Sequence, residues 1–369
     1  MSIKVTLFRD FCEDQRISME VYSDSLFDAL QTYFSERCQV HEYRAQVPSR
    51  LGDGIWQMRL LRFGIYPWQA RHQQGQINHI VDHGYGHLLY MLDPARTVVT
   101  VHDLIPLVRW CGGIPGLSRG RKPWLNLFSF NALRRAKYLI ADSENTRNDL
   151  IRFCHCSPEE ITIVYPGVNP IFRPYSPVEK SRARQELGLP GDAAFNVLIM
   201  GSQIYKNQIG AVRAFVQLRQ IFQRPLQLLK IGPPDAEWRD SINRFGLSEA
   251  VRCFEFIPSD KLPDLYNSVD CLLFPSLYEG FGWPPLEAMA CGTPVVASNA
   301  ASLPEVIGDA GLMCGPQDYR GLAEAMNAIF TNSQLRQDLI VRGLSHASQF
   351  TWERTARQTL EVYERVAKA

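Results

Sequence analysis

The chain has 369 residues, which is enough for two domains of ordinary size. Hydrophobic residues make up 46% of it and charged residues 21%, a composition that excludes a disordered polymer. The formal net charge of +1 excludes a general nucleic-acid-binding protein, which needs a large excess of basic residues.

The first part of the chain alternates short apolar segments with helical patterns. Helical periodicity is predicted at Ser23–Phe34, Trp56–Arg71 and Trp124–Ala136. Strands are predicted at Val5–Phe8, Val40–Tyr43, Ile77–Val81, Thr97–Val101, Tyr138–Ala141 and Ile161–Val164. Because such alternation builds a parallel sheet covered by helices, we expect a Rossmann-like domain over residues 1–170. The apolar run at the N-terminus is too short for a secretory signal peptide and is interpreted as the first strand.

A proline-rich connector, Phe172–Pro177, marks the boundary between two predicted domains. A second alternating series follows and predicts another Rossmann-like domain over residues 171–350. Its strands are expected at Phe195–Met200, Leu226–Ile231, Val251–Ile257, Cys271–Phe274, Val295–Ala297 and Leu312–Cys314. In open parallel sheets, ligands bind outside the carboxyl ends of the strands, so polar residues at those ends are candidate site residues.

The most informative stretch is Leu272–Ser298, which indicates a strand, a loop and a helix. The strand ends at Phe274, and the loop Tyr278–Gly282 precedes a helix that begins near Pro284 and carries Glu287. Free N–H groups of the loop and of the helix amino end would converge above the sheet edge.

Two carboxylates, Glu279 and Glu287, flank the N–H groups of the Gly280–Gly282 loop. Backbone N–H groups suit anionic ligands, and carboxylates accept hydrogen bonds from sugar hydroxyls. The stretch therefore predicts a site for a ligand that carries both phosphates and sugars.

The same stretch resembles the signature of retaining glycosyltransferase family 4, in which seven residues separate two glutamates. The likeness continues through Asn299–Val306 and Gly308–Gly311. It implies the GT-B architecture, with two Rossmann-like domains facing a central cleft and a C-terminal helix, residues 351–369, that crosses back to the first domain.

The resemblance also implies the activity, which is transfer of a hexose from a nucleotide-diphosphate sugar to a glycan or lipid-linked saccharide with retention of configuration. GDP-mannose and UDP-glucose are the donors that we expect. The chain has no Asp-x-Asp pair to hold a divalent metal on the diphosphate, so we expect neither a metal nor another cofactor.

The resemblance assigns roles to residues at the predicted strand ends. His102 lies close to the donor sugar, and Lys206 neutralises the departing diphosphate. Glu279 holds the hexose hydroxyls, and Glu287 holds the ribose hydroxyls. The other expected donor-binding residues are Ser18, Met19, Gly201, Ile257, Gly280, Phe281, Gly282 and Leu286.

The chain departs from the family pattern in two places. Relatives have a glycine-rich loop after the first strand, where this chain has residues 15–22, so we expect the N–H groups of Ser18 and Met19 to serve instead. Relatives also add an arginine near the lysine, where this chain has Ser202 and Tyr205. The second cation for the diphosphate is therefore unidentified.

A polar cluster follows the predicted strand that ends at Val81. Its residues are candidates for lining an acceptor pocket, and a polar loop with a capped helix is the alternative interpretation. The candidates are Asp82, His83, Tyr85 and His87.

The segment from Leu104 to Ala141 contains no acidic residue, and Trp110 and Trp124 are interleaved with its basic residues. It predicts contact with an anionic membrane or a lipid-diphosphate acceptor, with a solvated face as the alternative. The basic residues proposed for this contact are Arg109, Arg119, Arg121 and Lys122.

Other functional classes have weaker support. Ser118 lies in a Gly-x-Ser-x-Gly pattern typical of serine hydrolases, but no strand is predicted before it. A nucleotide-sugar epimerase or a binding-only relative of the same fold is the other alternative. Cys154-His155-Cys156 has no second pair at zinc spacing, so the nine cysteines indicate reduced thiols and a cytoplasmic protein, peripheral at most to a membrane.

Overall fold

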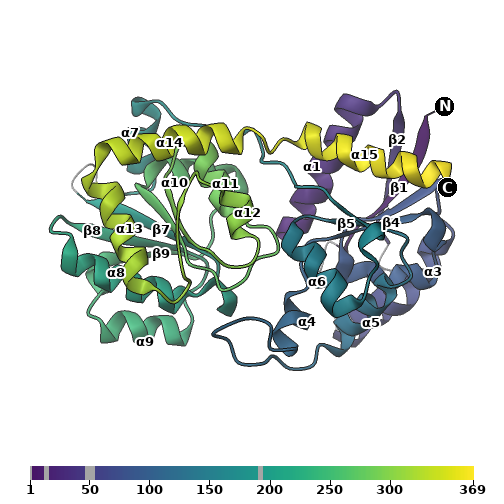
Figure 1. Cartoon of the computed structure of the whole chain (residues 1–369), viewed down its shortest axis with the longest axis horizontal. Coiled ribbons are helices and arrows are strands. Elements are labelled where there is room, and N and C mark those ends of the chain that lie inside the picture. The colour runs from purple at the N-terminus through teal and green to yellow at the C-terminus, as the bar shows by residue number, and fades with distance from the viewer. Residues whose placement is uncertain (1, 12–15, 46–54, 190–193) are drawn as a thin grey trace. The chain divides into compact units, whose positions relative to one another are not determined.

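The computed structural model describes all residues except 1, 12–15, 46–54 and 190–193 (Figure 1). The chain divides into two compact units. Unit 1 consists of Met1–Gly113, Ser118–Gly167 and Phe350–Ala369, and unit 2 consists of Ile114–Leu117 and Val168–Gln349. Each unit contains a six-stranded sheet whose strands are all parallel. Parallel strands need crossover connections, and helices supply most of them in both units.

The sheet of unit 1 has the strand order β2-β1-β3-β4-β5-β6. Its strands are β1 (Ile3–Phe8), β2 (Cys38–Tyr43), β3 (Ile77–Ile80), β4 (Thr97–Val101), β5 (Tyr138–Ala141) and β6 (Ile161–Ile163). Its first helices are α1 (Ile17–Phe34), α2 (Ile55–Leu60), α3 (Tyr66–Arg71), α4 (Ile105–Trp110), α5 (Trp124–Leu133) and α6 (Glu144–Cys154). Every residue of β3 and β4 is buried, as expected for central strands that are covered on both faces.

The sheet of unit 2 has the strand order β12-β11-β10-β7-β8-β9. Its strands are β7 (Phe195–Met200), β8 (Leu226–Ile231), β9 (Val251–Phe254), β10 (Cys271–Phe274), β11 (Val295–Ser298) and β12 (Leu312–Cys314). Its helices are α7 (Pro177–Glu186), α8 (Gln208–Ile221), α9 (Ala236–Arg244), α10 (Leu262–Ser268), α11 (Trp283–Ala290), α12 (Leu303–Ile307), α13 (Tyr319–Thr331) and α14 (Ser333–Ala347).

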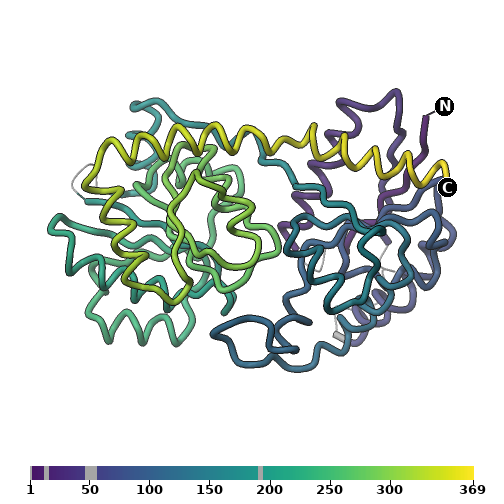
Figure 2. The backbone as a smooth tube through the Cα atoms, in the orientation of Figure 1, coloured from purple at the N-terminus to yellow at the C-terminus, as the bar shows by residue number. Residues whose placement is uncertain are grey.

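The last helix, α15 (Trp352–Lys368), belongs to unit 1, as the family resemblance implied (Figure 2). It packs against α1 and the sheet of unit 1. The Tyr363 hydroxyl lies 2.6 Å from Nδ1 of His79 on β3, and the Thr355 hydroxyl donates to the carbonyl of Tyr165 at 2.8 Å. The end of the chain therefore completes the core of the unit in which the chain begins.

All twelve predicted strands are present, and the differences lie at element ends. Strand β9 ends at Phe254, three residues before the predicted end, and α1 begins at Ile17 rather than at Ser23. The segment predicted as one helix over residues 56–71 is instead α2, a π-helical turn at Leu61–Ile65, and α3. Pro67 has no N–H for the carbonyl of Phe63, so the regular hydrogen-bond ladder is interrupted there.

Replacing Leu360 by alanine should destabilise unit 1, because this fully buried side chain lies on the face of α15 that packs on the unit. We expect the free energy of unfolding to fall by about 3 kcal/mol, measured by urea denaturation. The neighbouring exposed Glu361→Ala variant is the control and should change it by less than about 0.5 kcal/mol. Equal unfolding midpoints for the two variants would contradict the proposed packing of α15.

Candidate functional site

The strand order of unit 2 reverses between β7 and β10, which makes the carboxyl ends of these two strands the expected position of a ligand crevice. Lys206 follows β7, Glu279 follows β10, and their side chains meet there. Lys206 Nζ lies 2.8 Å from Oε1 and 2.9 Å from Oε2 of Glu279. The exposed fractions of the two side chains are 15% and 7%, so the ion pair is largely withdrawn from water.

The loop that carries Lys206 is held from several directions. Gly201 has φ +91°, and a Cβ atom there would lie 2.9 Å from Cγ of Lys206, so glycine lets the lysine stem pass close to the backbone. Asn207 also has positive φ, and its Nδ2 donates to the carbonyls of Pro275 at 2.9 Å and Pro316 at 2.7 Å. These bonds tie the loop after β7 to those after β10 and β12.

The loop that carries Glu279 is positioned by Ser302. The Ser302 hydroxyl donates to the carbonyl of Phe281 at 2.6 Å and lies 3.2 Å from the carbonyl of Glu279. Because a trans peptide points its N–H opposite to its carbonyl, the N–H groups of Gly280 and Gly282 are directed away from Ser302. Gly282 has φ +109° and directly precedes α11.

Glu287, on α11, accepts a hydrogen bond of 2.7 Å from the hydroxyl of Tyr266. Burial raises the pKa of Glu287 to about 7, although the Tyr266 hydroxyl acts in the opposite direction. Burial also raises the pKa of Tyr266 well above its usual value, so that hydroxyl remains a donor. Tyr266 is not recognisable as a site residue from the sequence, because a tyrosine on a short amphipathic helix is typical of a core position.

A second ammonium group at this edge of the sheet belongs to Lys230, near the end of β8. Its side chain is fully buried, and Nζ donates to the carbonyl of Gly232 at 2.8 Å. Burial lowers the pKa of Lys230. A Cβ atom on Gly232 would lie 2.4 Å from Oγ of Ser202, so the loops after β7 and β8 are in contact here. The sequence signal for Lys230 is a lysine within a predicted buried strand.

The other predicted donor-binding residues lie in different environments. Leu286 is fully buried in the core of unit 2, and Ile257 is half-buried beyond the end of β9. Ser18 and Met19 lie in the first turn of α1 rather than in a loop, and the N–H of Met19 donates to the carbonyl of Arg16 at 2.9 Å. Gln15, which begins the segment compared with the glycine loop of relatives, lies outside the described residues.

Unit 1 also has a reversal point, between β1 and β3, and two carboxyl groups lie there. Asp82 follows β3, accepts the N–H of Gly84 at 2.7 Å and pairs with Arg16. Asp10 follows β1 and is 3% exposed. Burial and then the charge of Asp82 raise the pKa of Asp10 to about 10. Burial also acts to raise the pKa of Asp82 itself. The Arg16 guanidinium outweighs this effect and lowers the pKa of Asp82 below its usual range.

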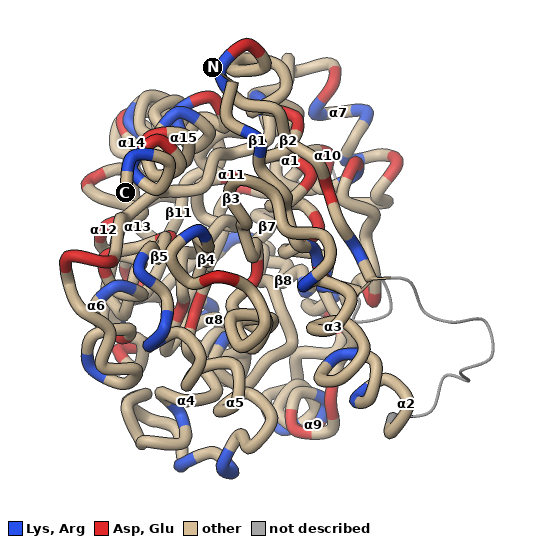
Figure 3. Tube along the Cα trace, turned by 90° about the vertical axis from the view of Figure 1, so that its right-hand side faces the viewer, with Lys and Arg blue, Asp and Glu red and all other residues tan. Residues whose placement is uncertain are grey.

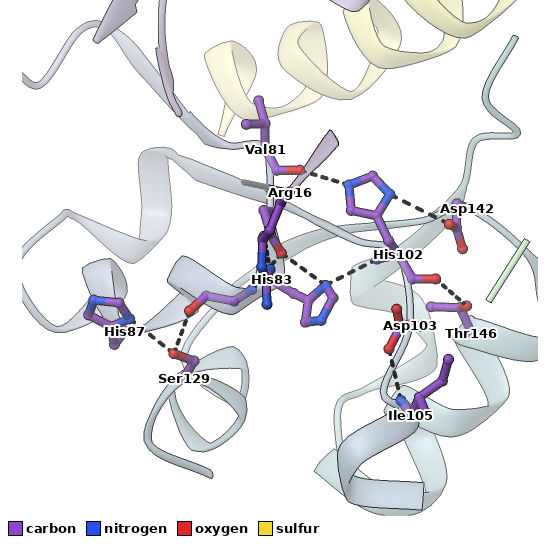
Figure 4. A network of polar contacts seen from close by, with 12 residues as sticks. Arg16, Val81, His83, His87, His102, Asp103, Ile105, Ser129, Asp142 and Thr146 are labelled. Carbon is purple, nitrogen blue, oxygen red and sulfur yellow. Dashed lines mark hydrogen bonds and ion pairs between the residues drawn. The ribbon is translucent and has the colours of Figure 1, made fainter. Parts of the chain in front are cut away.

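His102 follows β4, and both of its ring nitrogens face partners within unit 1 (Figure 4). Nε2 lies 2.9 Å from the carbonyl of Val81 and therefore carries a proton, while Nδ1 lies 3.5 Å from Oδ2 of Asp142. Burial works to lower the pKa of His102, but the Asp142 carboxyl outweighs it and the pKa is raised. Asp142 directly follows β5, a strand end that the sequence analysis did not use. Asp103 accepts the N–H of Ile105, in the turn that follows, at 2.9 Å.

Tyr85 and His87, proposed for the acceptor side, point into the interior of unit 1. The Tyr85 hydroxyl accepts the N–H of Phe11 at 3.1 Å. The ring nitrogens of His87 lie 3.0 Å from Oγ of Ser129 and 2.8 Å from the carbonyl of Arg62. These contacts hold the 3₁₀ segment His83–Tyr90 against α5, which carries Ser129, and against the π-helical turn, which contains Arg62. Of the acceptor-side candidates, Asp82 and His83 lie at the reversal point itself, with His83 Nδ1 3.3 Å from the Asp82 carboxyl.

The remaining candidates are placed as follows. Residues 111–123, all of which the structure describes, form neither strand nor helix, so Ser118 has no strand-to-helix turn around it. Within the described part of the chain, no group of three or more His, Cys, Asp and Glu side chains is arranged to hold a metal ion. In the same residues, we find no helix with the length and apolar character that crossing a bilayer requires.

Both parts of the chain match known family models. Residues 20–171 match Glycosyltransferase Family 4, and residues 179–346 match Glycosyl transferases group 1. The O-antigen chain mannosyltransferase B of Escherichia coli is 29% identical over 310 residues, which cover 83% of this chain and 78% of that protein. The serotype-specific mannosyltransferase WbdA of Escherichia coli is 28% identical over 289 residues, 75% of this chain, but the match spans only 34% of that longer protein.

Solved structures show the same fold. Sucrose-phosphate synthase from Thermosynechococcus elongatus aligns with a TM-score of 0.78 at 20% identity and 98% coverage of both chains. Anabaena Alr3699/HepE, in complex with UDP and glucose, aligns with a TM-score of 0.76 at 20% identity, covering 98% of this chain and 100% of that one. With two parallel six-stranded sheets and a glycosyltransferase model matching each part of the chain, this protein belongs to the family 4-like glycosyltransferases of the GT-B fold.

Proposed function

We propose that the chain is a retaining, metal-independent hexosyltransferase that uses a nucleotide-diphosphate sugar. The observation that carries this proposal is the contact between Lys206 and Glu279 at the reversal point of the unit 2 sheet. It brings an ammonium group for a diphosphate and a carboxylate for sugar hydroxyls to the position where an open parallel sheet binds its ligand. The ammonium takes the role that a divalent cation has in other transferases.

Lys206 acts on the leaving group. As the bond between C1 of the sugar and the diphosphate oxygen breaks, negative charge develops on that oxygen, and an ammonium already fixed beside it stabilises the transition state more than the ground state. The acceptor oxygen bonds to C1 from the same face, and its proton passes to the departing diphosphate. Without donor, Glu279 neutralises the ammonium. With donor, the phosphate oxygens share it and Glu279 accepts hydrogen bonds from the hexose.

Glu287 holds the nucleoside end of the donor. Its carboxylate accepts hydrogen bonds from the ribose hydroxyls, and Tyr266 orients it with the 2.7 Å hydrogen bond. The N–H of Gly282, at the start of α11, supplies a donor for an oxygen atom of the donor sugar between the two carboxylates. In unit 1, we propose that His102, with its ring held by Val81 and Asp142, contributes to the sugar site.

The relatives narrow the choice of substrates to test. Two of them are named mannosyltransferases, one of which acts on an O-antigen chain, and HepE was solved with UDP-glucose. GDP-mannose is therefore our first candidate donor and UDP-glucose the second. A glycan or lipid-linked saccharide of polysaccharide assembly is the proposed acceptor, with Asp82 and His83 on the acceptor side.

The proposed reaction can be tested by NMR. Incubation with GDP-mannose and a mannose-containing oligosaccharide in the presence of EDTA should give a product whose new bond has the same anomeric configuration as the donor, at an undiminished rate. UDP-glucose is the alternative donor in a parallel sample. Donor without acceptor is the control, because conversion of the sugar there would indicate an epimerase instead. An inverted product, or loss of the rate with EDTA, would contradict the proposal.

Lys206→Ala and Glu279→Ala should each reduce kcat at least about 100-fold, because each removes a charged group aimed at the reacting sugar. Lys261→Ala is the matched control, since that lysine directly precedes α10, is exposed and pairs with Asp264 in the first turn of that helix. Thermal unfolding separates lost chemistry from lost fold, because each single variant leaves a buried charge without its partner. A folded variant with the wild-type rate would refute the role of that residue.

Donor binding should tighten as the pH rises from 6 to 8, because a carboxyl with a pKa near 7 becomes a full acceptor only when ionised. A nucleotide sugar is the right probe, since its diphosphate does not titrate in this range. Glu287→Gln should abolish the dependence, measured by calorimetry. Tyr266→Phe removes a hydrogen bond to the ionised form and should shift the dependence upward by about one pH unit. An unchanged profile in Glu287→Gln would show that another group titrates.

A further inference from the structure

One part of unit 1 exposes an unusual amount of apolar surface. Of the seventeen large hydrophobic side chains that are exposed among the described residues, eight lie in two stretches of this unit, 56–91 and 124–128. Trp56 is 78% exposed and Trp124 is 71% exposed. We call the contiguous part of this surface the aromatic face and define it by Trp56, Leu60, Phe63, Tyr90, Met91, Trp124, Leu125 and Phe128.

Ring contacts join the three segments of the face through one residue of each, Phe63, Tyr90 and Phe128. The Phe128 ring of α5 lies 4.8 Å from that of Tyr90 and 6.0 Å from that of Phe63, measured between centroids. Phe63 lies in the π-helical turn that directly continues α2, which carries Trp56 and Leu60 one turn apart. Trp124 is one turn before Phe128 on α5. The interrupted helix over residues 55–71 therefore supplies three of the eight residues of the face.

Positive charges lie on the rings of the face. The Arg59 guanidinium is 5.0 Å from the ring centroid of Trp56, Lys122 Nζ is 3.8 Å from that of Trp124, and the Arg135 guanidinium is 5.5 Å from that of Tyr90. Residues 55–92 and 104–141, which contain the face, hold ten of the chain's 39 Lys and Arg residues but one of its 38 acidic residues. That acid is Asp82, which is buried and paired with Arg16. Figure 3 colours the positions of Lys and Arg blue and those of Asp and Glu red along the chain.

We propose that the aromatic face docks unit 1 on the surface of a lipid bilayer that contains anionic phospholipid. Tryptophan and tyrosine rings settle at the boundary between headgroups and acyl chains, and the arginine and lysine groups stacked on them reach the phosphates. Leu60, Met91 and Leu125 suit acyl chains. A second copy of the chain fits less well, because a twofold contact would place the same basic residues against one another.

This inference rests on the proposed function only in that a lipid-linked acceptor would be met at such a surface. It extends the basic segment predicted from the sequence, since Trp124 belongs to both and Lys122 lies over its ring. The apolar residues of α2 and of the π-helical turn, which make the surface suited to a bilayer rather than to a soluble anion, come from outside that segment.

The test is vesicle sedimentation with the full chain, using phosphatidylcholine vesicles with and without phosphatidylglycerol. We expect binding to the anionic vesicles that weakens as salt is raised. The double variant Trp56→Ser/Trp124→Ser should bind them at least about tenfold more weakly, because it removes two interfacial rings. Brominated phosphatidylcholine should quench the tryptophan fluorescence of the wild type more than that of the double variant.

The matched control is Tyr33→Ser/Val341→Ser, which removes two exposed apolar side chains from α1 and α14. It should bind as the wild type does. Equal binding by the double variant and the control, or no binding to anionic vesicles, would overturn the proposal. A wild-type dimer that the Trp56→Ser/Trp124→Ser variant abolishes would assign the face to a contact between copies instead. Thermal shift with GDP-mannose should be the same in all variants, so failure of the donor site is distinguishable from failure of docking.

Discussion

The buried contact between Lys206 and Glu279 is the interaction that organises unit 2. An ion pair withdrawn from water is costly to form unless its geometry is well supported, and here the supports come from several loops. Asn207 ties the loop after β7 to the loops after β10 and β12, and the N–H of Leu277 donates to the carbonyl of Tyr205 at 2.7 Å. This support keeps the pair fixed before any ligand arrives, which is what electrostatic catalysis requires.

Unit 1 also holds ionisable groups away from water at the reversal point of its sheet, and there the groups are two carboxylic acids. Asp10 keeps its proton beside ionised Asp82, so two carboxyl groups share one buried position without two negative charges. His102 and Asp142 form a comparable pair one strand further along the sheet. The Asp10–Asp82 pair and the His102–Asp142 pair both lie at the carboxyl ends of the parallel strands. Side chains that follow different strands come together at this edge of the sheet.

The charged residues of the two proposed sites lie in separate parts of the chain. The chain as a whole is almost neutral, yet residues 55–92 and 104–141 are strongly basic. Their cations stack on exposed rings, whereas the cations of the unit 2 site are withdrawn from water. Lys206 is 15% exposed, and Lys230 is fully buried. The proposed attraction to an anionic surface and the proposed stabilisation of a diphosphate therefore involve different lysines and arginines.

The sequence by itself determined the two parallel-sheet domains, all twelve strands and the stretch Leu272–Ser298, because burial on both faces and the residues at strand ends are local patterns. Only the tertiary structure decided which strand ends meet. It paired Lys206 with Glu279, gave Tyr266 to Glu287 and turned His87 inward, since these contacts join residues that are 73, 21 and 42 positions apart. The aromatic face could not be predicted from the sequence either, because its residues are far apart in the chain. Phe63 and Phe128 become neighbours only when α5 packs beside the interrupted helix.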